Sequence, residues 1–333
     1  MDIHPTAIIS KKAKLGKDAQ VGPYVIIEDD VAIGQGVKIY AGAHISEHTT
    51  IGDDCQIHMG AILGHLPQMY QIPSKEGRLV IGPRNIFREY ATVHRSSRKG
   101  EATVIGEDNY LMGFSHIAHD CSIGSHVTIC NGTLLAGHVK VEDYAFISGN
   151  VTVHQFCRIG KLSMVGGLTR VAKDLPPYML AKGDSMVWAI NSVGLRRANF
   201  SRQARSEIKT AFKLLYKSGL NVRQAIKQLQ KDSRSSEIEY LINFILHTQR
   251  GICGYKKPAF WERIRLSNPT ISHRQIPAYQ LFQNSRKGQQ PLAIAIAFVL
   301  IILLLVCLKR PLRQKLQDTY HYLIREMQYS LSR

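Results

Sequence analysis

The chain has 333 residues, six cysteines and a formal net charge of +18, and this length admits two domains or one domain with an appendage. The cysteines form no CxxC pair and no tight framework, which argues against a disulfide scaffold and favours free thiols in a reducing compartment. Residues 1–185 hold 18 basic and 18 acidic side chains, so the basic excess is C-terminal; with no RNA or DNA motif beside it, this excess points to an acidic partner or an anionic membrane surface rather than to nucleic acid.

The N-terminal stretch MDIHPTAIIS is too weakly basic, and its apolar run too short, for a signal peptide, so this end of the chain is expected to stay in the cytoplasm. From Ile3 onward an apolar residue recurs every six positions. Of the 29 positions in this frame between residues 3 and 171, only Met69, Lys75 and Lys99 interrupt the aliphatic and aromatic series. All three fall in the stretches PQMYQIPSKEG and RSSRKG, which are predicted to be loops inserted into the repeat.

A period of six fits neither an α-helix nor a plain strand, which alternates with a period of two. The pattern predicts an all-β parallel β-helix of hexapeptide repeats over residues 1–185, in which eighteen residues make one three-sided coil and the aliphatic side chains stack inside. Glycine often follows the aliphatic residue, as at Gly34 and Gly106. We expect these glycines at tight corners, which glycine tolerates best.

The stretch GFSHIAHDC places two histidines and an aspartate outside the aliphatic frame. Neighbouring coils lie about 4.8 Å apart. His119, His138 and His154 are separated by 19 and 16 residues, close to one coil each, so they are expected to line one edge of the prism. His116 and Asp120 belong to the same strip, and none of the five has an evident packing role.

Three interpretations of this cluster stay open. The histidines can be solvated surface residues. They can bind zinc, as in the gamma-class carbonic anhydrases, but the paired ligands of those enzymes resemble H-x4-H whereas this chain has HIAH. The third interpretation is a general base, because His119 beside Asp120 resembles a catalytic triad without its serine. No serine or cysteine is placed as a nucleophile, so we expect direct attack by a substrate hydroxyl, with no metal or cofactor.

Five stretches carry a family resemblance: NIFREYATVHR (85–95), SHIAHDCSIG (115–124), LLAGHV (134–139), VHQFCRIG (153–160) and VAKDLPPYM (171–179). Over residues 1–252 the chain closely resembles the acyl carrier protein:UDP-N-acetylglucosamine O-acyltransferases, which begin lipid A synthesis. The resemblance implies a homotrimer of left-handed β-helices. It also implies transfer of a 3-hydroxyacyl chain from acyl carrier protein to the 3-hydroxyl of UDP-N-acetylglucosamine, in a cleft between adjacent subunits and without a covalent intermediate.

The resemblance also assigns roles to individual residues. His119 matches the general base, Asp120 its supporting carboxylate, and the Gly137 N–H the donor to the thioester oxyanion, which is a favourable use of a preorganised N–H. The positions matched to substrate binding are His116, His138, His154 and Gln155 for sugar, nucleotide or acyl hydroxyl, Gly167 for acyl length, and Asn191 and Arg197 for nucleotide or phosphate.

Four positions depart from the family pattern. Met69 and Gln71 stand where the family usually has an Asp and a Lys, and Val193 and Ala198 stand where it has a Glu and a second Arg. Each lost cation removes charge-assisted hydrogen bonds worth roughly 1.5 to 3 kcal/mol. The alternatives are therefore a divergent paralogue acting on a modified UDP-hexosamine, a zinc-dependent hydratase of the same fold, and a trimeric scaffold that binds without turnover.

After the β-helix the apolar period changes to three and four. Ser201 is predicted to cap a helix that ends near Gly219, and two further helices are predicted over residues 221–231 and 236–248. They complete an α-helical domain over residues 186–252. Its basic side chains, interpreted either as a docking surface for the acidic carrier protein or as a solvated face, are Arg196, Arg197, Arg202, Arg205, Lys209 and Lys213.

Beyond the resemblance, residues 253–290 are predicted to form a basic linker. The following segment LAIAIAFVLIILLLVCL has no polar side chain except Cys307. As a helix it would reach about 26 Å, close to the roughly 27 to 30 Å of a bilayer core. We therefore expect a transmembrane helix at residues 291–308, followed by a basic amphipathic tail at residues 309–333, that anchors a cytoplasmic catalytic domain to the inner membrane.

Overall fold

The computed structural model describes residues 2–232 and 235–255, all of which belong to one compact unit spanning Met1–Lys257. The predicted linker beyond residue 255, the apolar segment 291–308 and the tail 309–333 lie outside the described residues. None of the helices within the described ranges is both long enough and apolar enough to cross a membrane.

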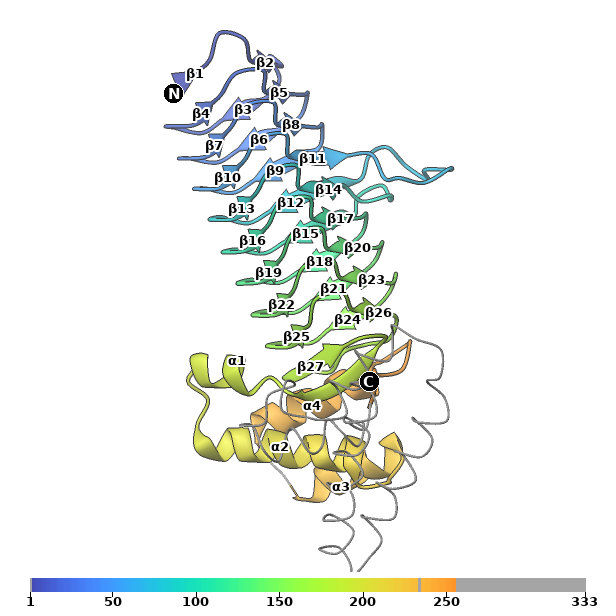
Figure 1. Cartoon of the computed structure of the whole chain (residues 1–333). Coiled ribbons are helices and arrows are strands. Elements are labelled where there is room, and N and C mark those ends of the chain that lie inside the picture. The colour runs from blue at the N-terminus through green and yellow to red at the C-terminus, as the bar shows by residue number, and fades with distance from the viewer. Residues whose placement is uncertain (1, 233–234, 256–333) are drawn as a thin grey trace, which may run out of the picture. The chain divides into compact units, whose positions relative to one another are not determined.

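Short strands pass in turn through three sheets, which form the faces of a triangular prism (Figure 1). The first sheet contains β1 (Asp2–Ile3), β4 (Gln20–Val21), β7 (Lys38–Ile39), β10 (Gln56–Ile57), β13 (Ile86–Phe87), β16 (Tyr110–Leu111), β19 (Thr128–Ile129), β22 (Phe146–Ile147), β25 (Met164–Val165), β27 (Met179–Lys182), β28 (Met186–Ile190) and β29 (Gly254–Tyr255). The second contains β2 (Ile8–Ile9), β5 (Ile26–Ile27), β8 (His44–Ile45), β11 (Ile62–His65), β14 (Thr92–His94), β17 (His116–Ile117), β20 (Leu134–Leu135), β23 (Thr152–Val153) and β26 (Arg170–Val171). The third contains β3 (Lys14–Leu15), β6 (Ala32–Ile33), β9 (Thr49–Ile51), β12 (Arg78–Ile81), β15 (Ala102–Ile105), β18 (Ser122–Ile123), β21 (Lys140–Val141) and β24 (Arg158–Ile159).

The register of the strands confirms the predicted parallel β-helix and its eighteen-residue coil. Ile3 pairs with Val21, one coil later. Across the first inserted loop Ile57 pairs with Phe87, thirty residues later, and across the second Ile81 pairs with Ile105, twenty-four residues later. Both insertions therefore add a multiple of six residues, so the apolar frame resumes in phase after each loop.

The frame side chains form the core of the prism. Ile27, Ile117 and the other frame residues of the middle coils are almost fully buried, whereas Ile3 in the first coil is exposed because no coil stacks beneath it. A second inward position lies two residues before each frame residue, and small side chains such as Ala91 and Cys121 fill it. The five cysteines within the described ranges are all free thiols, as expected.

The glycines that follow the frame residues serve close stacking of coils rather than the corner conformation, which corrects the expectation. A Cβ at Gly34 would lie 2.7 Å from the carbonyl carbon of Gly52, and a Cβ at Gly106 would lie 2.5 Å from the carbonyl oxygen of Gly124. The left-handed backbone conformation occurs at a different position of the repeat, two residues after the one that these glycines occupy. Non-glycine residues often occupy it, including Asp120 with φ of 60° and His138 with φ of 63°.

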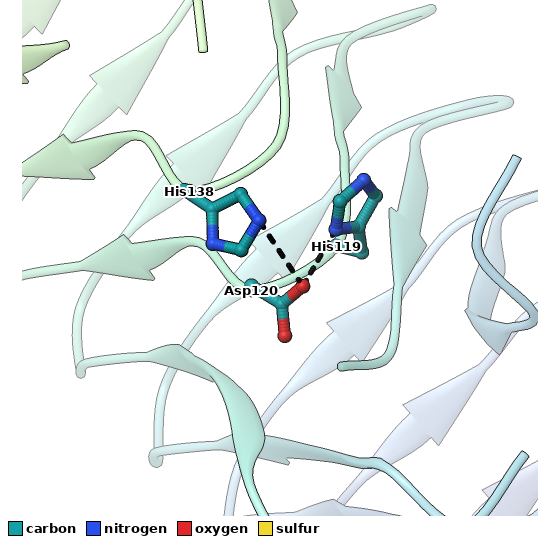
Figure 2. A group of neighbouring side chains, drawn as sticks. All are labelled: His119, Asp120 and His138. Atoms are coloured by element: carbon teal, nitrogen blue, oxygen red, sulfur yellow. Dashed lines mark hydrogen bonds and ion pairs between the residues drawn. The ribbon is translucent and has the colours of Figure 1, made fainter. Parts of the chain in front are cut away.

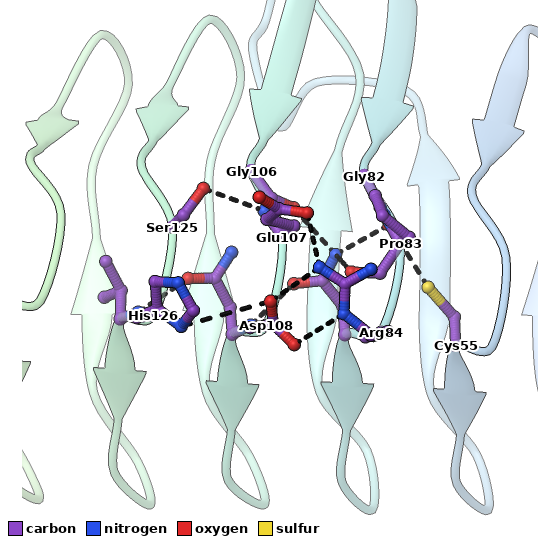
Figure 3. A network of polar contacts seen from close by, with 12 residues as sticks. Cys55, Gly82, Pro83, Arg84, Gly106, Glu107, Asp108, Ser125 and His126 are labelled. Atoms are coloured by element: carbon purple, nitrogen blue, oxygen red, sulfur yellow. Dashed lines mark hydrogen bonds and ion pairs between the residues drawn. The ribbon is translucent and has the colours of Figure 1, made fainter.

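The edge where the chain turns from the third sheet to the first carries a polar network (Figure 3). Arg84 forms ion pairs with Glu107 and Asp108, and His126 lies 4.0 Å from the same Asp108 carboxylate. Beneath them Asn85 donates hydrogen bonds to the carbonyl groups of two successive coils. Because the charged groups are partly exposed, the ion pairs add little stability. His126 is useful as a control because it lies on a different edge from the histidine cluster.

Four helices follow within the described residues: α1 (Ser192–Arg197), α2 (Arg202–Lys217), α3 (Val222–Asp232) and α4 (Ser236–Leu246). The Ser201 side chain accepts a hydrogen bond from the Ala204 N–H, so the predicted cap of α2 is confirmed. The Arg158 guanidinium, 3.8 Å from the centre of the Phe244 ring, also donates a hydrogen bond to the Phe244 carbonyl. It ties α4 to the β-helix. Strand β29 begins at Gly254, after the predicted end of the α-helical domain at residue 252. The predicted domain limits stay predictions.

Candidate active site

His119, Asp120 and His138 meet at the edge where the chain turns from the second sheet to the third (Figure 2). The Nδ1 of His119 lies 2.6 Å from Asp120 Oδ2, and His138 Nε2 lies 3.7 Å from the same oxygen. The two imidazole rings are perpendicular, with centroids 5.2 Å apart. The Asp120 side chain is 5% exposed and that of His119 is 15% exposed. A shielded carboxylate therefore orients a histidine that solvent can still reach.

The Asp120 carboxylate is held by the second inserted loop as well as by His119. Ser96 Oγ donates to Oδ1 at 2.5 Å and Ser97 Oγ donates to Oδ2 at 2.7 Å. Burial by itself raises the pKa of Asp120, but the hydrogen bonds from Ser96, His119 and Ser97 outweigh burial and lower the pKa to about 2. Asp120 is therefore ionised throughout the physiological pH range, and Ser96 and Ser97 are site residues that the sequence reasoning missed.

The ionised carboxylate fixes the proton on His119. Because Asp120 can only accept, His119 Nδ1 carries the proton that it donates to Oδ2, and Nε2 keeps its lone pair. Atoms of His119, Asp120 and His138 also lie within 4.8 Å of one another, a grouping that zinc could use. Zinc bound to Asp120 would have to replace at least one hydrogen bond, because each carboxylate oxygen already accepts two. The geometry favours a general base.

Columns of residues at eighteen-residue spacing define which side chains are neighbours. Gly137 follows His119 by one coil, and a Cβ at Gly137 would lie 2.7 Å from His119 Nε2. The Gly137 N–H has no acceptor among the described residues. His138 follows Asp120 by one coil and stacks on Phe156, with ring centroids 4.5 Å apart. Phe156 therefore lies directly beyond His138 in this column, and His154 lies on the same edge two residues earlier in the chain.

Comparison with known proteins identifies the family. The family profile described as UDP-N-acetylglucosamine O-acyltransferase, domain 2, matches residues 174–253, and a bacterial transferase hexapeptide profile matches residues 12–47, 30–65 and 102–137. The acyl-[acyl-carrier-protein]–UDP-N-acetylglucosamine O-acyltransferase of Thermodesulfovibrio yellowstonii is 43% identical over 255 residues, which cover 76% of this chain and 99% of that protein. The chain belongs to this O-acyltransferase family. The protein of the same name from Halorhodospira halophila is 42% identical, and the match covers 75% of this chain and 98% of that protein.

Solved structures of O-acyltransferases support the same family assignment. The UDP-N-acetylglucosamine acyltransferase of Francisella novicida superimposes with a TM-score of 0.73 at 34% identity, covering 81% of this chain and all of that one. The Campylobacter jejuni enzyme gives a TM-score of 0.72 at 34% identity, covering 77% of this chain and 100% of its own. The family match ends near the last described residues, and residues 256–333 extend beyond it.

The remaining residues that the O-acyltransferase resemblance assigns fall into three places. His116 lies on the second sheet next to the cluster, with Nδ1 2.7 Å from Thr92 Oγ1, and exposed His154 and Gln155 lie about two coils further on, directly after β23. Gly167 lies on another edge of the prism, between the first and second sheets. Arg197 is exposed at the end of α1.

Asn191, which the O-acyltransferase resemblance assigns to the nucleotide, is engaged within the chain. Its Oδ1 accepts from the Gly194 N–H at 3.0 Å, and its Nδ2 donates to the Leu162 carbonyl at 2.9 Å. The side chain thus caps α1 and fixes this helix to the β-helix. Contact with a nucleotide stays a prediction for Asn191, as the substrate-binding roles do for the other residues.

His94 is a buried histidine behind His116, with ring centroids 5.0 Å apart. Its Nδ1 has no hydrogen-bond partner among the described residues. Burial and the neighbouring His116, His65 and His119 lower the pKa of His94 to about 4. In the unfolded chain an unperturbed histidine titrates near 6.5. The unfolded chain therefore binds a proton first as the pH falls.

We expect this difference to make the fold less stable in acid. The contribution of neutral His94 is fully present above about pH 6.5 and is lost as the pH falls toward about 4, by up to about 3 kcal/mol. The His94→Gln variant should lose less unfolding free energy between pH 7.5 and 5 than the wild type in urea titrations at one protein concentration. His126→Gln, at an exposed position, is the matched control; equal pH slopes in all three proteins would contradict the prediction.

Proposed function

We propose that the protein transfers a 3-hydroxyacyl group from acyl carrier protein to the 3-hydroxyl of UDP-N-acetylglucosamine, the first step of lipid A synthesis, in the cytoplasm. The observation that carries this proposal is the His119 ring, fixed at Nδ1 by ionised Asp120 and facing Gly137 at Nε2. Membership of the O-acyltransferase family supports the identity of donor and acceptor. We also propose that the β-helix coils in the left-handed sense that the family resemblance implies.

The reaction follows from this geometry. His119 Nε2 takes the proton of the sugar 3-hydroxyl as its oxygen attacks the thioester carbonyl carbon. The Gly137 N–H is available to stabilise the oxyanion of the tetrahedral intermediate. When the intermediate collapses, the carbon–sulfur bond breaks and the proton on His119 passes to the thiolate of the carrier's prosthetic group. Asp120 stays ionised throughout and stabilises the imidazolium formed between the two proton transfers.

The positions of the predicted residues support a site shared between copies of the chain in a homotrimer. His119 lies between the second and third sheets, whereas Gly167 lies between the first and second sheets. One prism cannot bring two of its edges into a single cleft. A second copy can supply the other edge, and that edge exposes Tyr90 and Phe114, which stack on each other with ring centroids 5.3 Å apart, as well as Leu168.

Acyl transfer in vitro tests the proposal. Purified full-length protein with 3-hydroxyacyl carrier protein and UDP-N-acetylglucosamine is expected to release free carrier thiol and form the acylated sugar nucleotide. A second candidate acceptor is a modified UDP-hexosamine, favoured by Met69 and Gln71 in the first inserted loop and by Val193 and Ala198 in and after α1. Faster turnover of a modified UDP-hexosamine than of UDP-N-acetylglucosamine would identify the modified sugar as the acceptor. A folded protein that is inactive on every UDP-hexosamine would contradict both candidate acceptors.

Two further partners belong to the proposal. The acidic carrier protein would dock on α2, whose Arg202, Lys209 and Lys213 are exposed. The apolar run of residues 291–308 would anchor the protein to the inner membrane, a proposal supported by the sequence alone.

Removing residues 256–333 is expected to release the protein from the membrane fraction without reducing acyl transfer. The cut after Tyr255 keeps β29, which pairs with β28, and buried Cys253. Fractionation of cell lysates followed by activity measurements on both forms provides the test. A truncated form still found with membranes, or one that has lost turnover, would contradict a simple anchor.

A further inference from the structure

We propose that Ser96 and Ser97 are positioning residues for the general base, because their hydroxyl groups hold the Asp120 carboxylate in the orientation in which it aligns the His119 ring. The inference rests on the proposed function of His119. It adds residues from an inserted loop to the site, and these residues lie outside the five stretches that carry the family resemblance.

The contacts distribute four donors over the two carboxylate oxygens. Oδ1 accepts from Ser96 Oγ at 2.5 Å and from the Ser97 N–H at 3.2 Å. Oδ2 accepts from Ser97 Oγ at 2.7 Å and from His119 Nδ1 at 2.6 Å. Ser96 Oγ accepts in turn from the Arg98 N–H at 3.1 Å, which leaves its own proton for Asp120. The carboxylate therefore cannot rotate without breaking several charge-assisted hydrogen bonds.

The loop that carries the two serines is itself fixed. Ser96 is fully buried and Ser97 is 3% exposed. The Ser74 N–H of the first inserted loop donates to the Ser97 carbonyl at 3.0 Å, and the Ser96 N–H donates to the carbonyl of Arg78, which follows that loop, at 3.0 Å. Two insertions that interrupt the repeat thus support each other and the carboxylate. A rigid second layer is what a catalytic group needs to stay in its reactive geometry.

The serines are not nucleophiles in this arrangement. Both hydroxyl groups donate to Asp120, and neither has a hydrogen bond to His119 among the described residues. Their effect is transmitted through the carboxylate, in two ways. They fix the direction of the acceptor for His119 Nδ1–H, and they draw negative charge away from it, which limits how strongly Asp120 stabilises protonated His119.

Removing a serine hydroxyl should therefore lower kcat and also raise the pH below which activity falls. The titratable groups that interact with His119 are Asp120, His138, His116 and the buried His94; Arg98 and Glu101 act on His138. Ser96→Ala and Ser97→Ala are each expected to lose roughly tenfold in kcat with little change in KM. The acid limb of the kcat/KM profile should move up by about 0.5 pH unit because the unshared carboxylate charge favours imidazolium.

Two variants make the comparison specific. Ser97→Thr keeps a hydroxyl and is expected to retain most of the activity that Ser97→Ala loses. Ser163→Ala removes an equally buried hydroxyl, which donates to the Pro176 carbonyl at 2.8 Å away from the site, and should keep the wild-type acid limb. If both alanine variants keep wild-type kcat, or if their acid limb stays in place or falls, the inference is overturned.

A second measurement separates this inference from the proposed function. Titration of the His119 ring by NMR in histidine-labelled full-length protein needs no substrate, and the His119→Ala variant assigns the signal. The midpoint is expected to rise in Ser96→Ala and Ser97→Ala and not in Ser163→Ala. A wild type that transfers no acyl group would contradict the proposed function, while an unchanged midpoint would contradict the role of the serines.

Discussion

His119→Ala is expected to lower kcat for acyl transfer by about 10²- to 10⁴-fold, because no other described group near the site is held in the same way to take the proton of the attacking hydroxyl. His138 is close, but its Nε2 lies 3.7 Å from Asp120 and its ring stacks on Phe156. Its pKa is lowered by burial, which leaves it neutral and suited to hydrogen bonding. KM for the sugar nucleotide should change much less than kcat.

The fold should survive the His119 substitution, since the ring lies outside the apolar frame and only its hydrogen bond to Asp120 is lost. Initial rates with saturating carrier protein, together with thermal unfolding, separate chemistry from stability. His126→Ala removes a histidine from another edge of the prism and serves as the control (Figure 3). A His119→Ala enzyme with more than a tenth of wild-type kcat would exclude this residue as the general base.

The sequence predicted the scaffold well because one physical constraint repeats along it. Every coil must bury an apolar side chain on each face, so the six-residue frame is visible from Ile3 to Val171 without knowledge of any contact. The inserted loops preserve this frame because each adds a multiple of six residues. The helices after residue 200 were predictable for a similar reason, since Ser201 and the spacing of apolar residues in α2 act locally, whereas the short helix α1 was not predicted.

The site was only partly predictable because its contacts depend on register to the residue. Spacings of 19 and 16 suggested that His138 and His154 share an edge, and both follow strands of the second sheet on that edge, but the eighteen-residue register stacks Phe156 on His138. The contact of Ser96 and Ser97 with Asp120 spans a coil plus a six-residue insertion. Nothing in the sequence says how an inserted loop folds back, so the serines could not be assigned from spacing alone.

Residues that were predicted for the site but lie on another edge of the prism show a second limit of prediction from the sequence. Gly167 is exposed on the edge between the first and second sheets, away from His119. The repeat pattern of one chain determines which edge a residue occupies, but not which edges of separate copies meet. That pairing depends on surface side chains such as Phe114, which occupies a corner position of the repeat but whose contacts with another copy the repeat does not specify.

Gly137→Ala is expected to lower kcat by about 10²-fold or more through displacement of His119. The Cβ would lie 2.6 Å from Cε1 and 2.7 Å from Nε2 of the His119 ring, distances at which one group must move. The backbone at Gly137 is outside the left-handed region, so alanine is allowed there and the coil has no need to change. The ring can escape only by losing its 2.6 Å hydrogen bond to Asp120. A displacement of about 1 Å in a reacting group can cost 10²-fold in rate.

Gly113→Ala is the matched control for the His119 titration, because Gly113 occupies the same place in its hexapeptide on an edge of the prism away from His119. Its Cβ would lie 3.2 Å from Asn131 Nδ2 and 3.3 Å from the Glu89 carbonyl oxygen, contacts that need shifts of only a few tenths of an ångström. The substitution at residue 137 keeps the backbone N–H, so a loss of kcat would come from the methyl group pressing on His119 rather than from removal of an oxyanion donor. Because the NMR titration of His119 reports its bond to Asp120, its midpoint should fall in Gly137→Ala and stay in place in Gly113→Ala. A wild-type kcat in Gly137→Ala would mean that His119 moves aside without cost, and that Asp120 does not define its working position.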